Sequence, residues 1–117
     1  MNSFDVYATI RIITPSDSDY GKLLVFVYDD GSFPEIQLFH NENIEDKILQ
    51  NLSQIFYPSD LNIILSSRQI SSISSYGNKL EIFYNFVAHS TMSKIGSFIP
   101  FDKNSIELYR LAQNHTL

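Results

Sequence analysis

The alternation of apolar and polar positions predicts three strands in the first forty residues. Phe4–Thr14 alternates loosely and is rich in β-branched residues, as strands are. Lys22–Tyr28 is a nearly continuous apolar run, which predicts a strand buried on both faces. Glu35–Phe39 predicts a third, short strand. Between the last two, Asp29–Ser32 predicts a turn, because Gly31 tolerates a positive φ and aspartate caps its own backbone.

A strongly amphipathic helix is predicted after the third strand. Its apolar residues recur at spacings of three, four and one, which places them on one stripe: Ile44, Ile48, Leu49, Leu52, Ile55 and Phe56. Asn43 is expected to cap the first turn, where Glu45 and Asp46 complement the helix dipole. Pro58 ends the pattern, because proline disfavours helical geometry at the residue before it.

The rest of the chain predicts further strands and a short terminal helix. In order, the expected elements are a strand at Leu61–Ser72, a turn at Ser74–Lys79, a strand at Leu80–His89, a short strand within Lys94–Pro100 and a helix from Asn104 to about Gln113. The helix start carries Glu107 three residues after its polar cap, a reciprocal capping pattern. The element order predicts one α/β (α+β) domain over residues 1–117, with a central helix packed on a mixed sheet.

Composition excludes several classes of protein. The chain has 117 residues, 44% of them hydrophobic and only 18% charged, so it can bury a core and is not a disordered tail. It has no cysteine, which excludes disulfides, thiolate metal sites and a cysteine nucleophile. The net charge of −5, without a Lys/Arg cluster, argues against general nucleic-acid binding. A local site for a nucleotide stays open.

The chain also lacks the marks of export and membrane insertion. Its first residues have no basic start or continuous apolar run, and no apolar stretch approaches the ~20 residues of a membrane span. We therefore expect a cytoplasmic protein without membrane contact, in the host cytoplasm if it is viral. Abundant Asn, Ile, Ser, Phe and Tyr suggest an AT-rich coding sequence, as in many phages.

The segment Pro34–Pro58 combines a strand, a short acidic loop and the amphipathic helix. A known motif consists of a glycine, five residues, a Glu, seven residues and then Arg-Glu-apolar-any-Glu-Glu. In the best register the glycine falls on Ile36 and the first Glu on Glu42. The Arg-Glu-apolar triplet then falls on Gln50-Asn51-Leu52 and the final Glu-Glu pair on Gln54-Ile55. In this outline the segment resembles the core of a Nudix hydrolase domain with a degenerate motif. The closing PFDKNSIELYRLAQ also resembles that family's loop into its last helix.

The resemblance implies an α/β/α sandwich whose helix glutamates bind a divalent metal at a pyrophosphate. Here only Glu42 and Leu52 fit, and neutral Gln and Asn amides do not replace carboxylates as magnesium ligands. We therefore expect a non-catalytic binding or assembly module of viral type without a cofactor. Its partner would be a protein, or a nucleotide-type ligand bound without turnover.

Two alternatives remain open at this point. One is an atypical hydrolase of nucleoside-diphosphate-linked substrates, in which Glu42 and another acid bind Mg²⁺ or Mn²⁺. The other is a small α+β subunit of a homo-oligomer, in which the Ser-rich stretch Ser66–Ser75 forms an exposed strand edge used for pairing.

The candidate ligand-binding residues each have a structural alternative: His40, Glu42, Arg68, Tyr84, Phe86 and Arg110. The two aromatics would stack on a base, or simply pack in the core. The arginines would bind an anion, or form ion pairs. Glu42 lies with Glu45 and Asp46 in an acidic group that also suits a helix N-terminus.

Tyr76 is an aromatic residue in a Ser-rich turn and is the candidate for an interaction surface. His40, His89 and His115 are isolated in the sequence, so their spacing gives no support to a zinc site.

Overall fold

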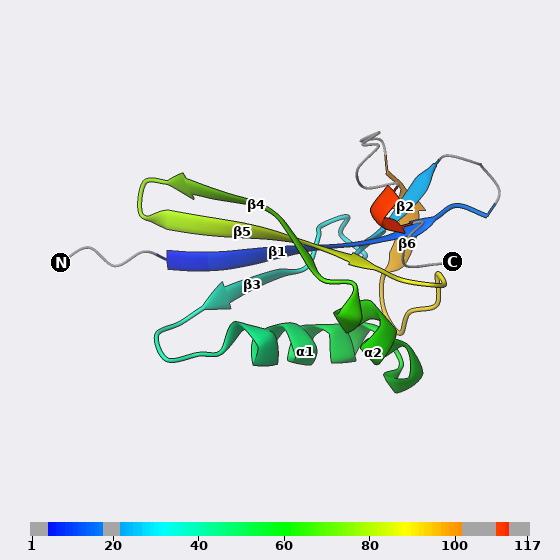
Figure 1. Ribbon diagram of the computed structural model, residues 1–117, viewed down its shortest axis with the longest axis horizontal. Coiled ribbons are helices and arrows are strands. Elements are labelled where there is room, and N and C mark those ends of the chain that lie inside the picture. The colour runs from blue at the N-terminus through cyan, green and yellow to red at the C-terminus, as the bar shows by residue number, and fades with distance from the viewer. Residues whose placement is uncertain (1–4, 18–21, 102–109, 113–117) are drawn as a thin grey trace.

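The computed structural model describes residues 5–17, 22–101 and 110–112, in which a mixed sheet is covered on one face by two helices (Figure 1). The elements in order are β1 (Asp5–Pro15), β2 (Leu23–Val27), β3 (Glu35–Leu38), α1 (Ile44–Ile55), α2 (Pro58–Ser66), β4 (Gln69–Tyr76), β5 (Lys79–Val87) and β6 (Ser97–Pro100). The predicted α+β class is confirmed. In the described residues, no helix is long and apolar enough to cross a membrane.

The long strand β1 organises the sheet, whose order is β4-β5-β1-β2-β6 with β3 also on β1. On one side β5 runs parallel to it over nearly its whole length, from Asp5 opposite Lys79 to Ile13 opposite Val87. On the other side two antiparallel strands divide β1 between them. β3 pairs with its first half and β2 with its last residues.

The main core lies between the sheet and the helices. Because side chains alternate along a strand, every second residue of β1 faces α1 and α2, and β5 contributes the matching row. The buried residues of this cluster include Ala8, Ile10, Ile12, Phe26, Ile48, Leu52, Ile55, Phe56, Ile64, Tyr84 and Phe86. A smaller cluster on the opposite face joins Ile13, Leu23, Val25 and Val87 to Ala112 of the C-terminal helical residues, drawn red in Figure 1.

Helix α1 begins as predicted. The Asn43 side chain accepts hydrogen bonds from the backbone N–H groups of Glu45 and Asp46, at 2.8 and 3.4 Å. Ile48 and Leu52 of the apolar stripe are buried, whereas Leu49 is 43% exposed. The helix ends at Ile55, before Pro58.

The predicted strand at Leu61–Ser72 is wrong in its first part. Pro58–Ser66 forms the second helix α2, and only from Gln69 does the chain become a strand. Proline suits the first position of a helix, because its φ is preset and its missing N–H would be unsatisfied there anyway. Ile64 is buried in the core as a helical residue. A short apolar run such as LNIIL does not distinguish the two structures.

The turn predicted at Ser74–Lys79 is narrower than expected. β4 continues through Tyr76, and the reversal is made at Gly77 and Asn78, where Gly77 has a φ of 60°. The predicted single central helix is likewise replaced by two. Most of the predicted terminal helix lies outside the described residues, although residues 110–112 are helical.

Candidate functional site

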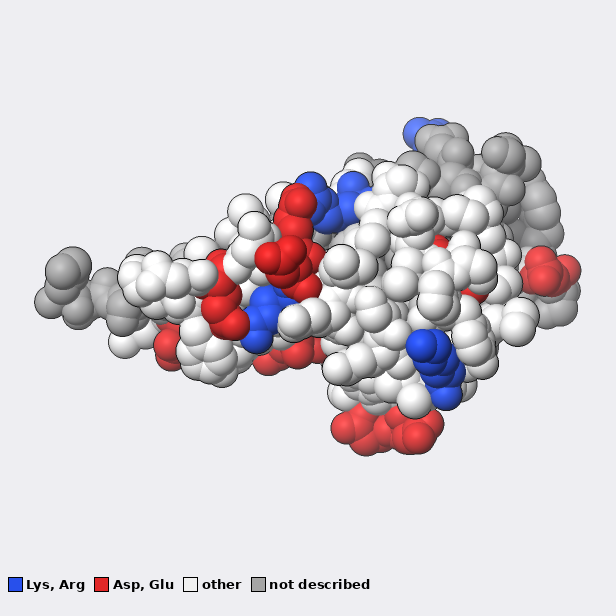
Figure 2. Space-filling model, turned by 90° about the horizontal axis from the view of Figure 1, so that it is seen from below, with Lys and Arg blue, Asp and Glu red and all other residues white. Residues whose placement is uncertain are grey.

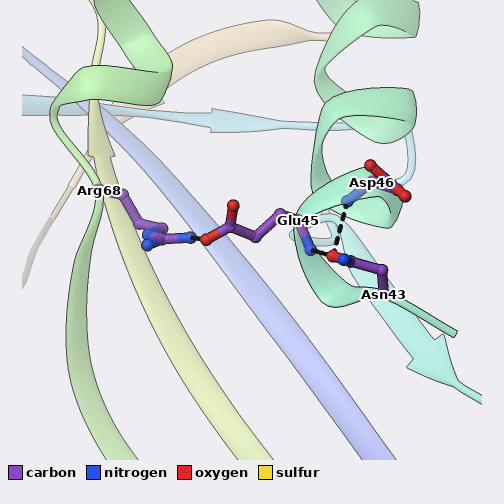
Figure 3. A network of polar contacts seen from close by, with 4 residues as sticks. All are labelled: Asn43, Glu45, Asp46 and Arg68. Atoms are coloured by element: carbon purple, nitrogen blue, oxygen red, sulfur yellow. Dashed lines mark hydrogen bonds and ion pairs between the residues drawn. The ribbon is translucent and has the colours of Figure 1, made fainter.

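An open groove of about 430 Å³ lies between the start of α1 and the α2–β4 connection. We call it the α1 groove, and its lining is Glu45, Asp46, Ile48, Leu49, Leu65, Ser66 and Arg68. The guanidinium of Arg68 reaches across to the carboxylate of Glu45 at 2.6 Å (Figure 3). Both side chains are largely exposed, so this ion pair contributes little to stability.

Acidic side chains gather beside basic ones over the α1 end of the molecule (Figure 2). In this region Lys47 pairs with Glu42 and Arg68 with Glu45. Glu42 accepts a hydrogen bond from the Phe39 N–H at 2.8 Å and forms an ion pair with Lys47 at 2.8 Å. The bond from Lys47, followed by that N–H, lowers the pKa of Glu42. Glu42 thus closes the turn that precedes α1. His40 is exposed in the same turn.

The motif positions on α1 point in different directions. Gln50 and Gln54 are exposed, whereas Ile55 is fully buried. Asn51 faces the sheet and donates from Nδ2 to the Tyr28 hydroxyl at 3.1 Å, while its buried Oδ1 has no partner. The positions that align with the acids of the motif are therefore divided between solvent and core.

The two aromatic candidates lie in the core. Tyr84 is 4% exposed and Phe86 is fully buried, and their rings stack with centroids 6.3 Å apart. Burial favours the core-packing alternative for both. Arg110 is exposed on the helical residues that pack against the other sheet face.

The six predicted ligand residues therefore do not meet in one site. The structure leaves His40 and Glu42 together in a turn and Arg68 at the α1 groove. Within residues 5–17, 22–101 and 110–112, His, Asp and Glu side chains form no group of three or more suited to a metal ion.

The clearest exposed feature is the strand β4, at the upper edge of the sheet in Figure 1 and away from α1. All eight of its residues, Gln69–Tyr76, are exposed, and among the described residues it pairs only with β5. We call this strand the β4 edge. Tyr76 is 86% exposed, as expected, and Ile70 and Ile73 are 54% and 60% exposed. The strand contains no charged residue and no proline, the usual protection of an edge.

The sheet face opposite α1 and α2 contains a polar network that the sequence does not predict. Arg11 donates from Nε to Asn85 Oδ1 at 3.1 Å and from Nη2 to Ser71 Oγ at 3.0 Å. The available signal was Arg11 itself, a charged residue in the middle of an apolar strand. Its partners are 74 and 60 residues away, so only the sheet register identifies them.

In comparisons with known proteins, no family model and no curated protein matches this chain.

Proposed function

We propose that this chain is a Nudix-like binding module that engages a protein partner without turnover, by accepting an extended segment at the β4 edge. The observation that carries the proposal is an edge strand whose eight residues are all exposed and include no charged residue and no proline. Such an edge presents unpaired backbone N–H and C=O groups, and partner segments add to sheets through these groups. Ile70 and Ile73 supply apolar contacts beside them.

Two features support the Nudix-like part of the proposal. Three strands precede α1, and after α2 the chain forms a hairpin whose second strand runs parallel to β1. The family's metal-binding glutamates correspond to Asn51, Gln54 and Ile55 on α1, none of which carries charge. Asn51 bonds to Tyr28 instead. Loss of turnover with retention of the fold is consistent with both features.

Partner binding is tested by placing a photo-crosslinking amino acid at Ser74, with Asp29 as the control position, in cells that naturally contain the protein. We expect a specific adduct from position 74 on the β4 edge and none from the exposed turn at 29. Ile73→Lys should abolish the adduct, because an edge lysine opposes strand addition. Met92→Lys is the matched control, since Met92 is 64% exposed away from β4. An adduct that survives Ile73→Lys contradicts the proposal.

Turnover is tested with nucleoside-diphosphate-linked compounds in the presence of Mg²⁺ or Mn²⁺. We expect no product. Metal-dependent product that disappears in Glu42→Gln would instead establish the hydrolase alternative. Product that persists in that variant would remove Glu42 from the mechanism but would still refute the absence of turnover.

The uncharged β4 edge also favours a second candidate function, a subunit that pairs with another copy of itself. Two copies of this strand meet without charge repulsion, despite the net charge of −5. Sedimentation equilibrium over a wide concentration range should then show a dimer. Ile73→Lys should shift it to monomer, and Met92→Lys should leave it unchanged. A monodisperse monomer at high concentration removes this candidate.

A further inference from the structure

The sheet face opposite α1 and α2 contains a cation, Arg11, that pairs with no carboxylate of the described residues. Arg11 is flanked along β1 by Ile10 and Ile12 of the main core, so its own side chain lies on the face opposite the helices. Burial lowers the pKa of Arg11. No acid of the described residues forms an ion pair with it, and its two bonds go to the neutral oxygens of Asn85 and Ser71.

The network fixes the position of the guanidinium. Asn85 is 1% exposed and bonds to Nε, so one edge of the planar group is held on β5. The other bond depends on an irregularity of β4. Ile70 is opposite Tyr84 but Ser72 is opposite Phe83, which leaves Ser71 as an extra residue whose hydroxyl reaches Arg11. Bulges of this kind often re-aim a side chain next to a functional site.

An arginine has more N–H donors than these two bonds use, and its planar fork suits phosphate and carboxylate oxygens. The neighbouring row of the same face contains Phe83, opposite both Thr9 and Ser72. Phe83 is half-buried, so part of its ring is accessible, and Ser72 is exposed. A phosphate at Arg11 would therefore lie beside the ring of Phe83 and the exposed hydroxyl of Ser72.

We propose that Arg11 and Ser71 bind the phosphate group of a nucleoside phosphate, whose base stacks on Phe83. The phosphate part of the proposal rests on Arg11, whose guanidinium is held in place and pairs with no acid of the described residues. The base-stacking part rests on the strand register, which places Phe83 in the adjacent row. The site shares Ser71 with the β4 edge, but it lies on the sheet face rather than along the strand's unpaired backbone and does not depend on the function proposed there. Nothing in it performs chemistry on the ligand, so it is a binding site.

The test is an NMR titration of the full chain with adenosine monophosphate, inorganic phosphate and adenosine at low ionic strength. We expect saturable shifts of the Arg11, Ser71 and Asn85 amides with the two phosphates. Arg11→Gln should weaken phosphate binding by about tenfold or more, as expected for loss of a charged hydrogen-bond donor. Arg68→Gln, at the α1 groove, is the control and should bind normally.

Further variants and ligands test the phosphate-binding and base-stacking parts of the site separately. If Arg11→Gln does not fold, Ser71→Ala tests the phosphate site instead. This variant removes only an exposed hydroxyl, and it should still weaken phosphate binding. Adenosine monophosphate should bind about fivefold or more tighter than inorganic phosphate, an advantage that Phe83→Leu abolishes. Equal affinities would overturn the base-stacking part. Absence of saturable shifts, or unchanged affinity in Arg11→Gln, would overturn the whole proposal.

Discussion

Replacing Gly96 by alanine should destabilise the protein severely. Gly96 precedes β6 with a φ of 68°, and a Cβ there would collide with the Val27 carbonyl oxygen and lie 2.6 Å from Cζ of Phe26. Left-handed geometry costs an alanine about 1–2 kcal/mol, and overpacking a core costs about 1–3 kcal/mol. The free energy of unfolding should therefore fall by about 2–5 kcal/mol.

The buried ring of Phe26 has little room to move away, since it is fully buried and contacts the rings of Tyr28, Phe56 and Phe98 with centroids 5.6–5.8 Å apart. Gly77→Ala is the matched control, because Gly77 also has a positive φ of 60° but a Cβ there meets nothing within 4 Å.

Urea denaturation followed by circular dichroism measures both variants. The two should share the backbone cost of about 1–2 kcal/mol, so Gly96→Ala should lose about 1–3 kcal/mol more than Gly77→Ala. Equal losses would show that the collision is relieved without cost and would refute the packing argument.

Four further outcomes are expected. Asn43→Ala should lower the free energy of unfolding by about 1 kcal/mol in urea titrations, because the cap of α1 is lost. Ser67→Ala should cost about 1–3 kcal/mol in the same assay, since the buried hydroxyl accepts from the Val87 N–H at 2.7 Å and its removal leaves that donor unsatisfied. In a carboxyl NMR titration, Lys47→Met should raise the depressed pKa of Glu42. A carboxylate whose pKa is lowered by folding stabilises the protein at any pH above its unfolded-state pKa. This contribution is lost as the pH falls through the folded-state pKa. The variant Glu42→Gln lacks the contribution, so it should lose less stability in acid than the natural chain.

The sequence predicts those elements whose period is unambiguous. α1 has a six-residue apolar stripe and a polar cap, and β5 alternates over most of its length. The sequence does not predict α2, because LNIIL is too short to show a period and Pro58 also fits the end of the preceding helix. For the same reason the sequence predicts a strand from Leu61, whereas β4 begins only at Gln69.

The candidate sites were less predictable, because they depend on which strands become neighbours. Tyr76 could be recognised from its local surroundings, and it is exposed. The contact of Arg11 with Ser71 could not, since it requires both the parallel pairing of β1 with β5 and an extra residue in β4. In the segment Pro34–Pro58, Glu42 pairs with its close neighbour Lys47 along the chain.

The pairing of β1 with β5 also governs the order in which this chain can fold. Each residue of β1 from Asp5 to Ile13 meets a partner 74 positions later, and a chain of 117 residues must be synthesised to Val87 before that ladder is complete. Closing so long a loop is entropically costly, and folds that depend on distant pairs form slowly. During synthesis β1 has only β2 and β3 to cover one of its sides. Its other side stays open to chaperones, or to misassociation, until the hairpin of β4 and β5 emerges.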